Sequence, residues 1–181
     1  MSLEIVPVWK KVTPELSSAL IAMWARNHAL PDPTRAAERA QQAVAVGRDT
    51  ETGALWGVGT AVLGIVPSFG QPTYLYRQFF DVGARGLKQT VPFLKRILET
   101  LEAHNASLPK PESVGVMIEL QNDDMAKRYQ DMFEEEVRAH FIGWSPRGNQ
   151  LRMMYFKGAK IMLPADAVPK KRPGGGPPRA G

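Results

Sequence analysis

Residues 114–133, VGVMIELQNDDMAKRYQDMF, carry the strongest structural signal in the chain. The apolar run that begins at Val114 is typical of a buried strand, and it stops at Asn122. The residues that follow have the periodicity of an amphipathic helix, which carries Tyr129 seven positions beyond the asparagine. This order places a tyrosine hydroxyl near the mouth of a strand, where it can serve as a proton donor.

Outward from this stretch, the sequence predicts a mixture of helices and strands that forms a single domain. Thr13 and Pro14 have the types expected at a helix start. The predicted helices cover residues 14–28, 34–42 and 93–105. The predicted strands cover residues 4–8, 44–46, 54–66, 73–82, 138–144 and 151–157, of which the second and third form a hairpin.

Composition excludes several classes of protein. The chain of 181 residues is 44% hydrophobic and 23% charged, as expected for one globular domain. It has no cysteine, which excludes disulfides and cysteine-bound zinc, and its three histidines are too widely spaced to predict a metal site. The apolar run over residues 54–66 has 13 residues and is too short to span a bilayer. Without a signal pattern at the N-terminus, we expect a cytoplasmic protein.

The positive charge is concentrated at the C-terminus. The net charge is +5, and residues 164–181 hold four basic residues against Asp166, a net of +3. This segment also holds five prolines and four glycines. We therefore expect a domain over residues 1–163 and a disordered basic tail over residues 164–181. Weak nucleic-acid binding through this tail is an alternative to a solvated tail.

The order of elements and two groups of residues resemble the GNAT superfamily of acyl-CoA-dependent N-acyltransferases. Asn122 and Tyr129 keep the spacing of the last motif of that family, with Met125 where alanine is usual and Phe133-Glu134 in place of Gly-Phe. Upstream, residues 79–82 are similar to the end of the fourth strand of the family. The resemblance covers about residues 3–157.

The resemblance implies an α+β fold. It consists of a mixed, mostly antiparallel central sheet of six to seven strands, flanked by about four helices, in which the fourth and fifth strands splay apart. It also implies that the pantetheine arm of acetyl-CoA lies between these strands, bound by the main chain around Phe80 and Val82. The pyrophosphate is then expected on the amides at the start of the helix that contains Phe93, because helix N-termini favour anions.

The phosphate loop of the resemblance departs from the pattern of the family. Arg85-Gly86 resemble its start, but Lys88 and Thr90 stand at two of its glycine positions. Lys88 could neutralise a phosphate and Thr90 could donate its hydroxyl, although an ordinary capped helix explains Thr90 equally well. Asn122 is grouped by its spacing with the cofactor-binding residues, and it is also expected to cap the following helix.

The implied chemistry needs a neutral amine, a stabilised oxyanion and a protonated leaving thiolate. Tyr129 is the candidate acid for the thiolate; the alternative is a tyrosine that only packs against the sheet. Glu119 is the candidate base, with a pKa raised by burial, or else it pairs with an arginine. Asp81 is a weaker candidate base. His28 would lie near the acceptor pocket, or it simply ends a helix.

We therefore predict an acetyl-CoA-dependent N-acetyltransferase that transfers directly to an unidentified small-molecule or peptide amine. The alternative is a catalytically inactive GNAT-fold protein that acts as an interaction or structural subunit, as in phage- or virion-associated proteins. Either function is compatible with a homo-oligomer or a larger protein assembly. No metal and no membrane partner is expected.

Overall fold

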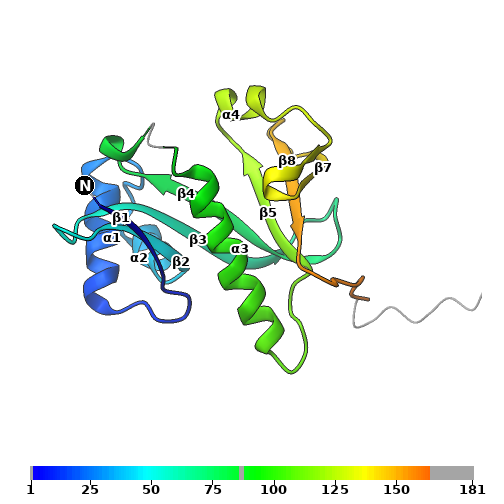
Figure 1. The fold of residues 1–181 in the computed structure, drawn as a ribbon, viewed down its shortest axis with the longest axis horizontal. Coiled ribbons are helices and arrows are strands. Elements are labelled where there is room, and N and C mark those ends of the chain that lie inside the picture. Colours follow the sequence, from blue (N-terminus) through cyan, green and yellow to red (C-terminus); the bar gives the residue numbers. More distant parts are fainter. Residues whose placement is uncertain (1, 86–87, 164–181) are drawn as a thin grey trace, which may run out of the picture.

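The computed structural model describes residues 2–85 and 88–163, and it contains one eight-stranded sheet in the order β1-β2-β3-β4-β5-β8-β7-β6 (Figure 1). The strands are β1 (Leu3–Pro7), β2 (Ala43–Asp49), β3 (Leu55–Ile65), β4 (Pro72–Phe80), β5 (Gly115–Leu120), β6 (Phe133–Glu134), β7 (Ala139–Trp144) and β8 (Gln150–Tyr155). All neighbours are antiparallel except β4 and β5, which are parallel. The predicted α+β class, the mostly antiparallel sheet and the hairpin are confirmed.

Three of the four helices in the described part of the chain begin at a residue whose side chain caps the helix. The helices are α1 (Pro14–Arg26), α2 (Pro33–Ala40), α3 (Thr90–Ser107) and α4 (Asp123–Arg128), with short 3-10 turns η1 (Val82–Ala84) and η2 (Glu135–Val137). The Thr13 hydroxyl accepts from the Leu16 amide at the start of α1, as its position before Pro14 predicts. At the start of α2, Asp32 accepts from the amides of Thr34 and Arg35.

Helices cover both faces of the sheet, and α3 lies diagonally across one of them (Figure 1). Phe93, Ile97 and Leu101 of α3 are fully buried against a core that includes residues of β4, β5 and β8. On the other face, α1 and α2 pack over β2 and β3 through a second core, which includes Leu20 and Met23. Helix α3 therefore spans both halves of the sheet, whereas α1 and α2 cover only the β1–β3 side.

The parallel strands β4 and β5 pair over only part of their length. Their register joins Tyr74 with Val116 and ends at Tyr76 with Ile118, although β4 continues to Phe80 and β5 to Leu120. Each strand keeps its outer partner throughout, since β4 pairs with β3 to Phe80 and β5 pairs with β8 to Leu120. The two strands diverge beyond Tyr76 (Figure 1), which confirms the splay implied by the GNAT resemblance.

Two expectations need correction. The sheet has eight strands instead of six or seven, because Phe133 and Glu134 pair with His140 and Ala139. The helix after Asn122 was expected to carry Tyr129, but α4 ends at Arg128 and Tyr129 is its C-cap, with φ −100° and ψ 87°. The chain turns into β6 at the point where the sequence predicted a longer helix.

The described residues contain no helix long and apolar enough to cross a bilayer. In the same part of the chain, no three or more His, Cys, Asp or Glu side chains gather closely enough to hold a metal ion. The basic tail, residues 164–181, lies outside the described residues.

We predict that Gly59→Ala destabilises the protein. A Cβ at Gly59 would lie 2.6 Å from Cδ1 of Ile97 and 2.8 Å from the ring of Tyr76, because α3 sits directly on β3 at this position. Overpacking of this kind costs about 1–3 kcal/mol. The cost is measured as a lower midpoint of urea unfolding.

The matched control is Gly83→Ala, where the nearest atom to the added Cβ is Oδ1 of Asp81 at 4.0 Å. Its unfolding free energy is expected to stay within about 0.5 kcal/mol of the wild type. Equal stability of the two variants would contradict the close contact between α3 and β3.

Candidate functional site

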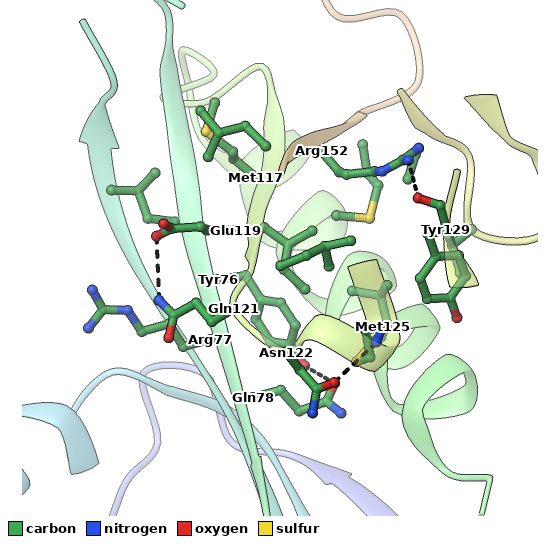
Figure 2. A pocket seen from close by; sticks show the side chains of 18 of the residues that line it. Tyr76, Arg77, Gln78, Met117, Glu119, Gln121, Asn122, Met125, Tyr129 and Arg152 are labelled. Carbon is green, nitrogen blue, oxygen red and sulfur yellow. Dashed lines mark hydrogen bonds between the residues drawn. The ribbon is translucent and has the colours of Figure 1, made fainter. Parts of the chain in front are cut away.

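A cavity of about 490 Å³ opens where β4 and β5 separate (Figure 2). Arg77 and Gln78 of β4 line one side of it, and Glu119 and Leu120 of β5 line the other. Its remaining wall includes side chains from α2, from the first turn of α3, from α4 and from β8: Arg39, Thr90, Val91, Leu94, Asn122, Met125, Tyr129, Arg152 and Met154. The wall is more apolar than polar, as in many small-molecule sites.

The start of α3 faces this cavity through Thr90 and Val91. The N-cap residue, Gln89, makes no side-chain capping hydrogen bond. An N-terminal turn without a capping side chain can receive an anion on its amides. Lys88, just before it, has φ 55°, the left-handed backbone that glycine adopts at least cost. The backbone at position 88 therefore keeps a conformation typical of glycine, although the residue there is a lysine.

Tyr129 reaches the cavity from the end of α4. Asn122 begins this helix by accepting from the amides of Asp124 at 2.9 Å and Met125 at 3.1 Å, so its expected capping role is confirmed. The Tyr129 side chain is half-buried and lines the cavity together with Asn122 and Met125 (Figure 2). Its hydroxyl has no hydrogen-bond partner within residues 2–85 and 88–163. The hydroxyl is therefore available to a ligand.

Arg152 of β8 holds the segment after α4 in place. Its side chain is 3% exposed and donates to the main-chain carbonyls of Tyr129 at 2.7 Å and Asp131 at 2.6 Å. It also donates to the side chain of Gln150, and Glu134 lies 3.9 Å away. These contacts explain why α4 ends early: a buried guanidinium binds the carbonyls of residues that would otherwise continue the helix.

Glu119 lies on the cavity wall, but its predicted raised pKa is wrong. Burial raises the pKa, yet hydrogen bonds from Ser145, Asn149 and Arg147 outweigh this effect and lower it to about 2. The Arg147 guanidinium lies 2.5 Å from the carboxylate, and the Asn149 amide donates at 3.0 Å. The alternative of an arginine pair is confirmed, and a carboxylate held in this way is a weak proton acceptor.

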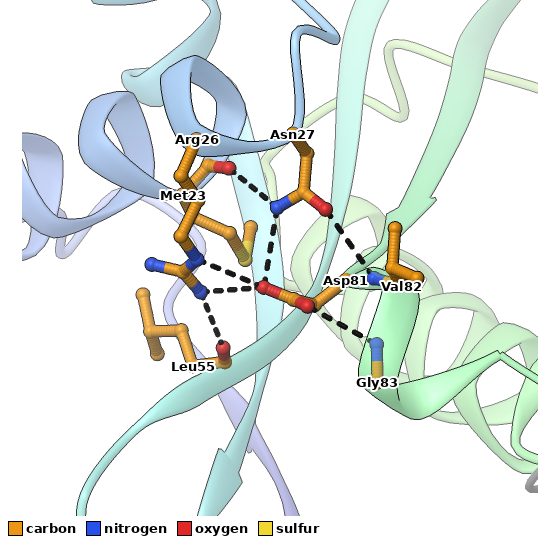
Figure 3. A network of polar contacts seen from close by, with 7 residues as sticks. All are labelled: Met23, Arg26, Asn27, Leu55, Asp81, Val82 and Gly83. Carbon is orange, nitrogen blue, oxygen red and sulfur yellow. Dashed lines mark hydrogen bonds and ion pairs between the residues drawn. The ribbon is translucent and has the colours of Figure 1, made fainter.

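Asp81 fixes the end of β4 to the end of α1 (Figure 3). Its carboxylate lies 2.6 Å from Nη2 of Arg26 and 3.2 Å from the side-chain amide of Asn27, and it accepts from the main chain of Gly83. Burial raises the pKa of Asp81, but these contacts lower it below its ordinary value. Asp81 does not line the cavity. His28 is an exposed residue with φ 52° just beyond α1, as expected of a helix end.

Three other predicted cofactor residues, Phe80, Val82 and Arg85, do not line the cavity. Phe80 packs its ring against Trp56 and Phe93. The Val82 amide donates to Asn27, and its side chain is 60% exposed. Arg85 is an exposed residue that follows η1. Gly86 lies outside the described residues.

Sequence reasoning missed Arg77, Gln78, Arg39 and Arg152. A signal existed for three of them: Arg77 and Gln78 interrupt an aromatic strand, and Arg152 interrupts an apolar one. Charged residues inside otherwise apolar strands often serve a site or a buried network. No comparable signal marks Arg39, which lies on a helix rich in charged residues.

The sequence matches no protein-family profile and no curated protein. Its structure is similar to a GNAT-family acetyltransferase from Streptococcus pneumoniae, at 10% identity and a TM-score of 0.59, over 86% of this chain and 99% of that chain. It is also similar to AtaTR bound with acetyl-CoA, at 13% identity and a TM-score of 0.55, over 86% and 95% of the two chains. A third similar structure is an aminoglycoside 6'-N-acetyltransferase complexed with coenzyme A, at 12% identity and a TM-score of 0.50, over 84% and 96%.

We predict that Glu119→Gln changes the pH dependence of stability. The folded pKa of about 2 lies below the ordinary value of 4.5, so the stabilisation is complete above pH 4.5 and is lost as the pH falls towards 2. At pH 7 the wild type should therefore be more stable than the variant by about 1–3 kcal/mol. Denaturant unfolding at pH 7 and pH 3 measures this difference, which should shrink at the lower pH.

The matched control is Glu99→Gln, which removes a carboxylate that is 66% exposed and paired with Arg96 at 3.3 Å. An exposed pair contributes little, so the stability of this variant should follow that of the wild type at both pH values. A stability loss in Glu119→Gln that stays constant between pH 7 and pH 3 would argue against the lowered pKa.

Proposed function

Because the chain has the GNAT fold, we propose that it is an acetyl-CoA-dependent N-acetyltransferase that transfers directly to an amine. The observation that carries this proposal is the cavity at the point where β4 and β5 separate. It lies beside the part of β4 that no longer pairs with β5, and beside the first turn of α3. Two structures with this fold contain acetyl-CoA or coenzyme A, which supports the same ligand here.

The residues present fit such a ligand. Beyond Tyr76, β4 has no partner strand on the cavity side, so its main chain near Arg77 and Gln78 can hydrogen-bond an extended amide-bearing arm. The amides of the first turn of α3 suit a pyrophosphate, and Lys88, an exposed residue, precedes this turn by two positions in the sequence. Thr90, in the same turn, lines the cavity.

Bound acetyl-CoA supplies a thioester. The neutral acceptor amine attacks the thioester carbonyl carbon, a C–N bond forms, and the C–S bond breaks. Tyr129 donates its hydroxyl proton to the departing sulfur, which otherwise leaves as a thiolate. Arg152 positions this residue by donating to the main-chain carbonyl of Tyr129.

The lining provides no free carboxylate as a base. Its two acidic side chains are Glu119, paired with Arg147, and Glu134, near Arg152. The acceptor therefore has to bind as the neutral amine. After the attack its nitrogen is positively charged, and it loses one N–H proton to water to give the amide. This requirement favours activity that rises with pH through the pKa of the acceptor amine.

We predict that acetyl-CoA stabilises the protein by about 2.7 kcal/mol at a hundredfold excess over its dissociation constant. A thermal-shift titration measures this effect. Ile118→Trp places a large ring at the last paired position of β5 and should abolish the shift. The control, Ile65→Trp, changes a residue that is 62% exposed and should keep it. The absence of a shift in the wild type would favour the inactive interaction protein.

We predict that Tyr129→Phe lowers kcat by about a hundredfold, the size of a general-acid contribution, with little change in the dissociation constant for acetyl-CoA. Release of the coenzyme A thiol with the best amine of a panel measures kcat, and calorimetry measures the affinity. Tyr155→Phe is the matched control, because this tyrosine lies on β8 and does not line the cavity. An unchanged kcat in Tyr129→Phe would remove Tyr129 from the mechanism.

A further inference from the structure

We propose that Arg39 and Arg77 form an anion-binding subsite on the α2 side of the cavity, which selects acceptor amines that carry a carboxylate or a phosphate on the same molecule. This inference rests on the proposed acetyl transfer and specifies the class of acceptor. Both side chains line the cavity, one from α2 and one from β4.

The position of Arg77 follows from strand alternation. Tyr76 packs into the core beneath α3, whereas Leu75 packs into a separate cluster with Met117 on the opposite face. Because successive side chains alternate, Arg77 lies on the face of Leu75, away from α3. Figure 2 shows Arg77 on the side of Glu119 and away from Tyr129. The cavity thus joins two faces of the sheet: the α3 side, which suits the cofactor, and the α2 side, which carries the arginines.

The positive charge of this subsite is not neutralised by the described part of the chain. No carboxylate there lies within 4.0 Å of the guanidinium of Arg39 or Arg77. The lining carboxylate on the same side as Arg77, Glu119, is already held by Arg147 and Asn149 (Figure 2). An internal ion pair therefore does not explain why two arginines gather here.

Arg35 adds a third positive charge one helical turn before Arg39. Burial and the neighbouring charges of Arg77 and Arg35 lower the pKa of Arg39, the direct effect of crowding like charges beside a half-buried group. Like charges four residues apart also destabilise a helix. Glu38 of the same helix forms no ion pair with Arg35 or Arg39 among the described residues, so a carboxylate of α2 holds neither guanidinium.

The chemistry of the guanidinium defines the ligand. Its planar fork of donors matches the two oxygens of a carboxylate or a phosphate. Arg39 is half-buried, so solvent is partly excluded there and such charge-assisted bonds are strong, whereas Arg77 is exposed. The same positive field disfavours a second cation nearby, so it lowers the pKa of an acceptor ammonium group. The subsite therefore binds the anionic end of the acceptor and favours the neutral amine that attacks. This supplies part of what a carboxylate base would do.

The first experiment tests the subsite without any catalysis. Inorganic phosphate and malonate are titrated into the protein by calorimetry at constant ionic strength, in the wild type and in the double variant R39Q/R77Q. The double variant should bind at least one of the two probes about tenfold more weakly or worse, as expected for lost charge-assisted hydrogen bonds. The matched control, Arg48→Gln, changes an exposed arginine of β2 outside the cavity and should bind as the wild type does. Equal affinity for both probes in the wild type and the double variant overturns the inference.

The second experiment tests selectivity in the proposed reaction. Two pairs of amines, glycine against glycinamide and O-phosphoethanolamine against ethanolamine, are compared by release of the coenzyme A thiol. In the wild type, kcat/KM should favour the anionic member of at least one pair by about tenfold or more, and that ratio should fall towards one in R39Q/R77Q. The pair that shows the preference distinguishes a carboxylate from a phosphate.

The outcomes separate the two proposals. If acetyl-CoA binds and both neutral amines react as well as their anionic partners, the subsite is overturned while the transferase remains. If acetyl-CoA fails to bind, the transferase fails, and the phosphate and malonate titrations alone decide whether the subsite exists. A double variant that has lost its fold is recognised by its melting temperature, and the single variants R39Q and R77Q then replace it in both experiments.

Discussion

The structure depends on the partial pairing of β4 and β5. Each strand has a complete partner on its outer side, β3 for β4 and β8 for β5, but the register between them ends at Tyr76 and Ile118. The sheet therefore consists of two fully paired halves that share a short parallel junction. Beyond that junction, the edges of β4 and β5 that face each other have no strand partner. Main-chain groups that are partly buried and unpaired favour a ligand that can form hydrogen bonds with them. Helix α3 packs on residues of both halves, so it connects them through one core.

The charges around this opening are arranged asymmetrically. Its carboxylates are held by arginines from later strands and turns, Glu119 by Arg147 and Glu134 near Arg152, and these contacts are part of the architecture. Its other cations, Arg39 and Arg77, have no such carboxylate among the described residues. An anionic ligand therefore meets arginines without an ion-pair partner among the described residues, whereas a cationic ligand meets carboxylates that already lie near arginines. This asymmetry is consistent with an acceptor that is anionic at one end and neutral at its reacting nitrogen.

Features that depend on residues close together in the sequence were predicted better than features that depend on distant residues. The caps of Thr13 and Asn122 and the hairpin depend on residues close together in the chain, and these were predicted correctly, as was the order of the elements apart from the short strand β6. The errors come from distant partners. Arg152 ends α4 from 23 residues away, and Arg147 lowers the pKa of Glu119 from 28 residues away. Local periodicity carries no trace of either contact, so the early helix end and the strong acidity of that carboxylate required the structure.

The segment before α3 has Lys88 at a position where the GNAT pattern has glycine. A glycine gives a phosphate loop two properties, cheap positive φ and the absence of a Cβ. Lys88 keeps the first, with φ 55°, at a cost of about 1 kcal/mol. Unlike glycine, Lys88 has a Cβ, and its side chain carries a positive charge. The anchoring of Asp81 to Arg26 and Asn27 fixes the other end of this segment to α1 (Figure 3). A phosphate at α3 would then be held more by charge than by close backbone approach, so its binding should depend more strongly on ionic strength than in a glycine-rich loop.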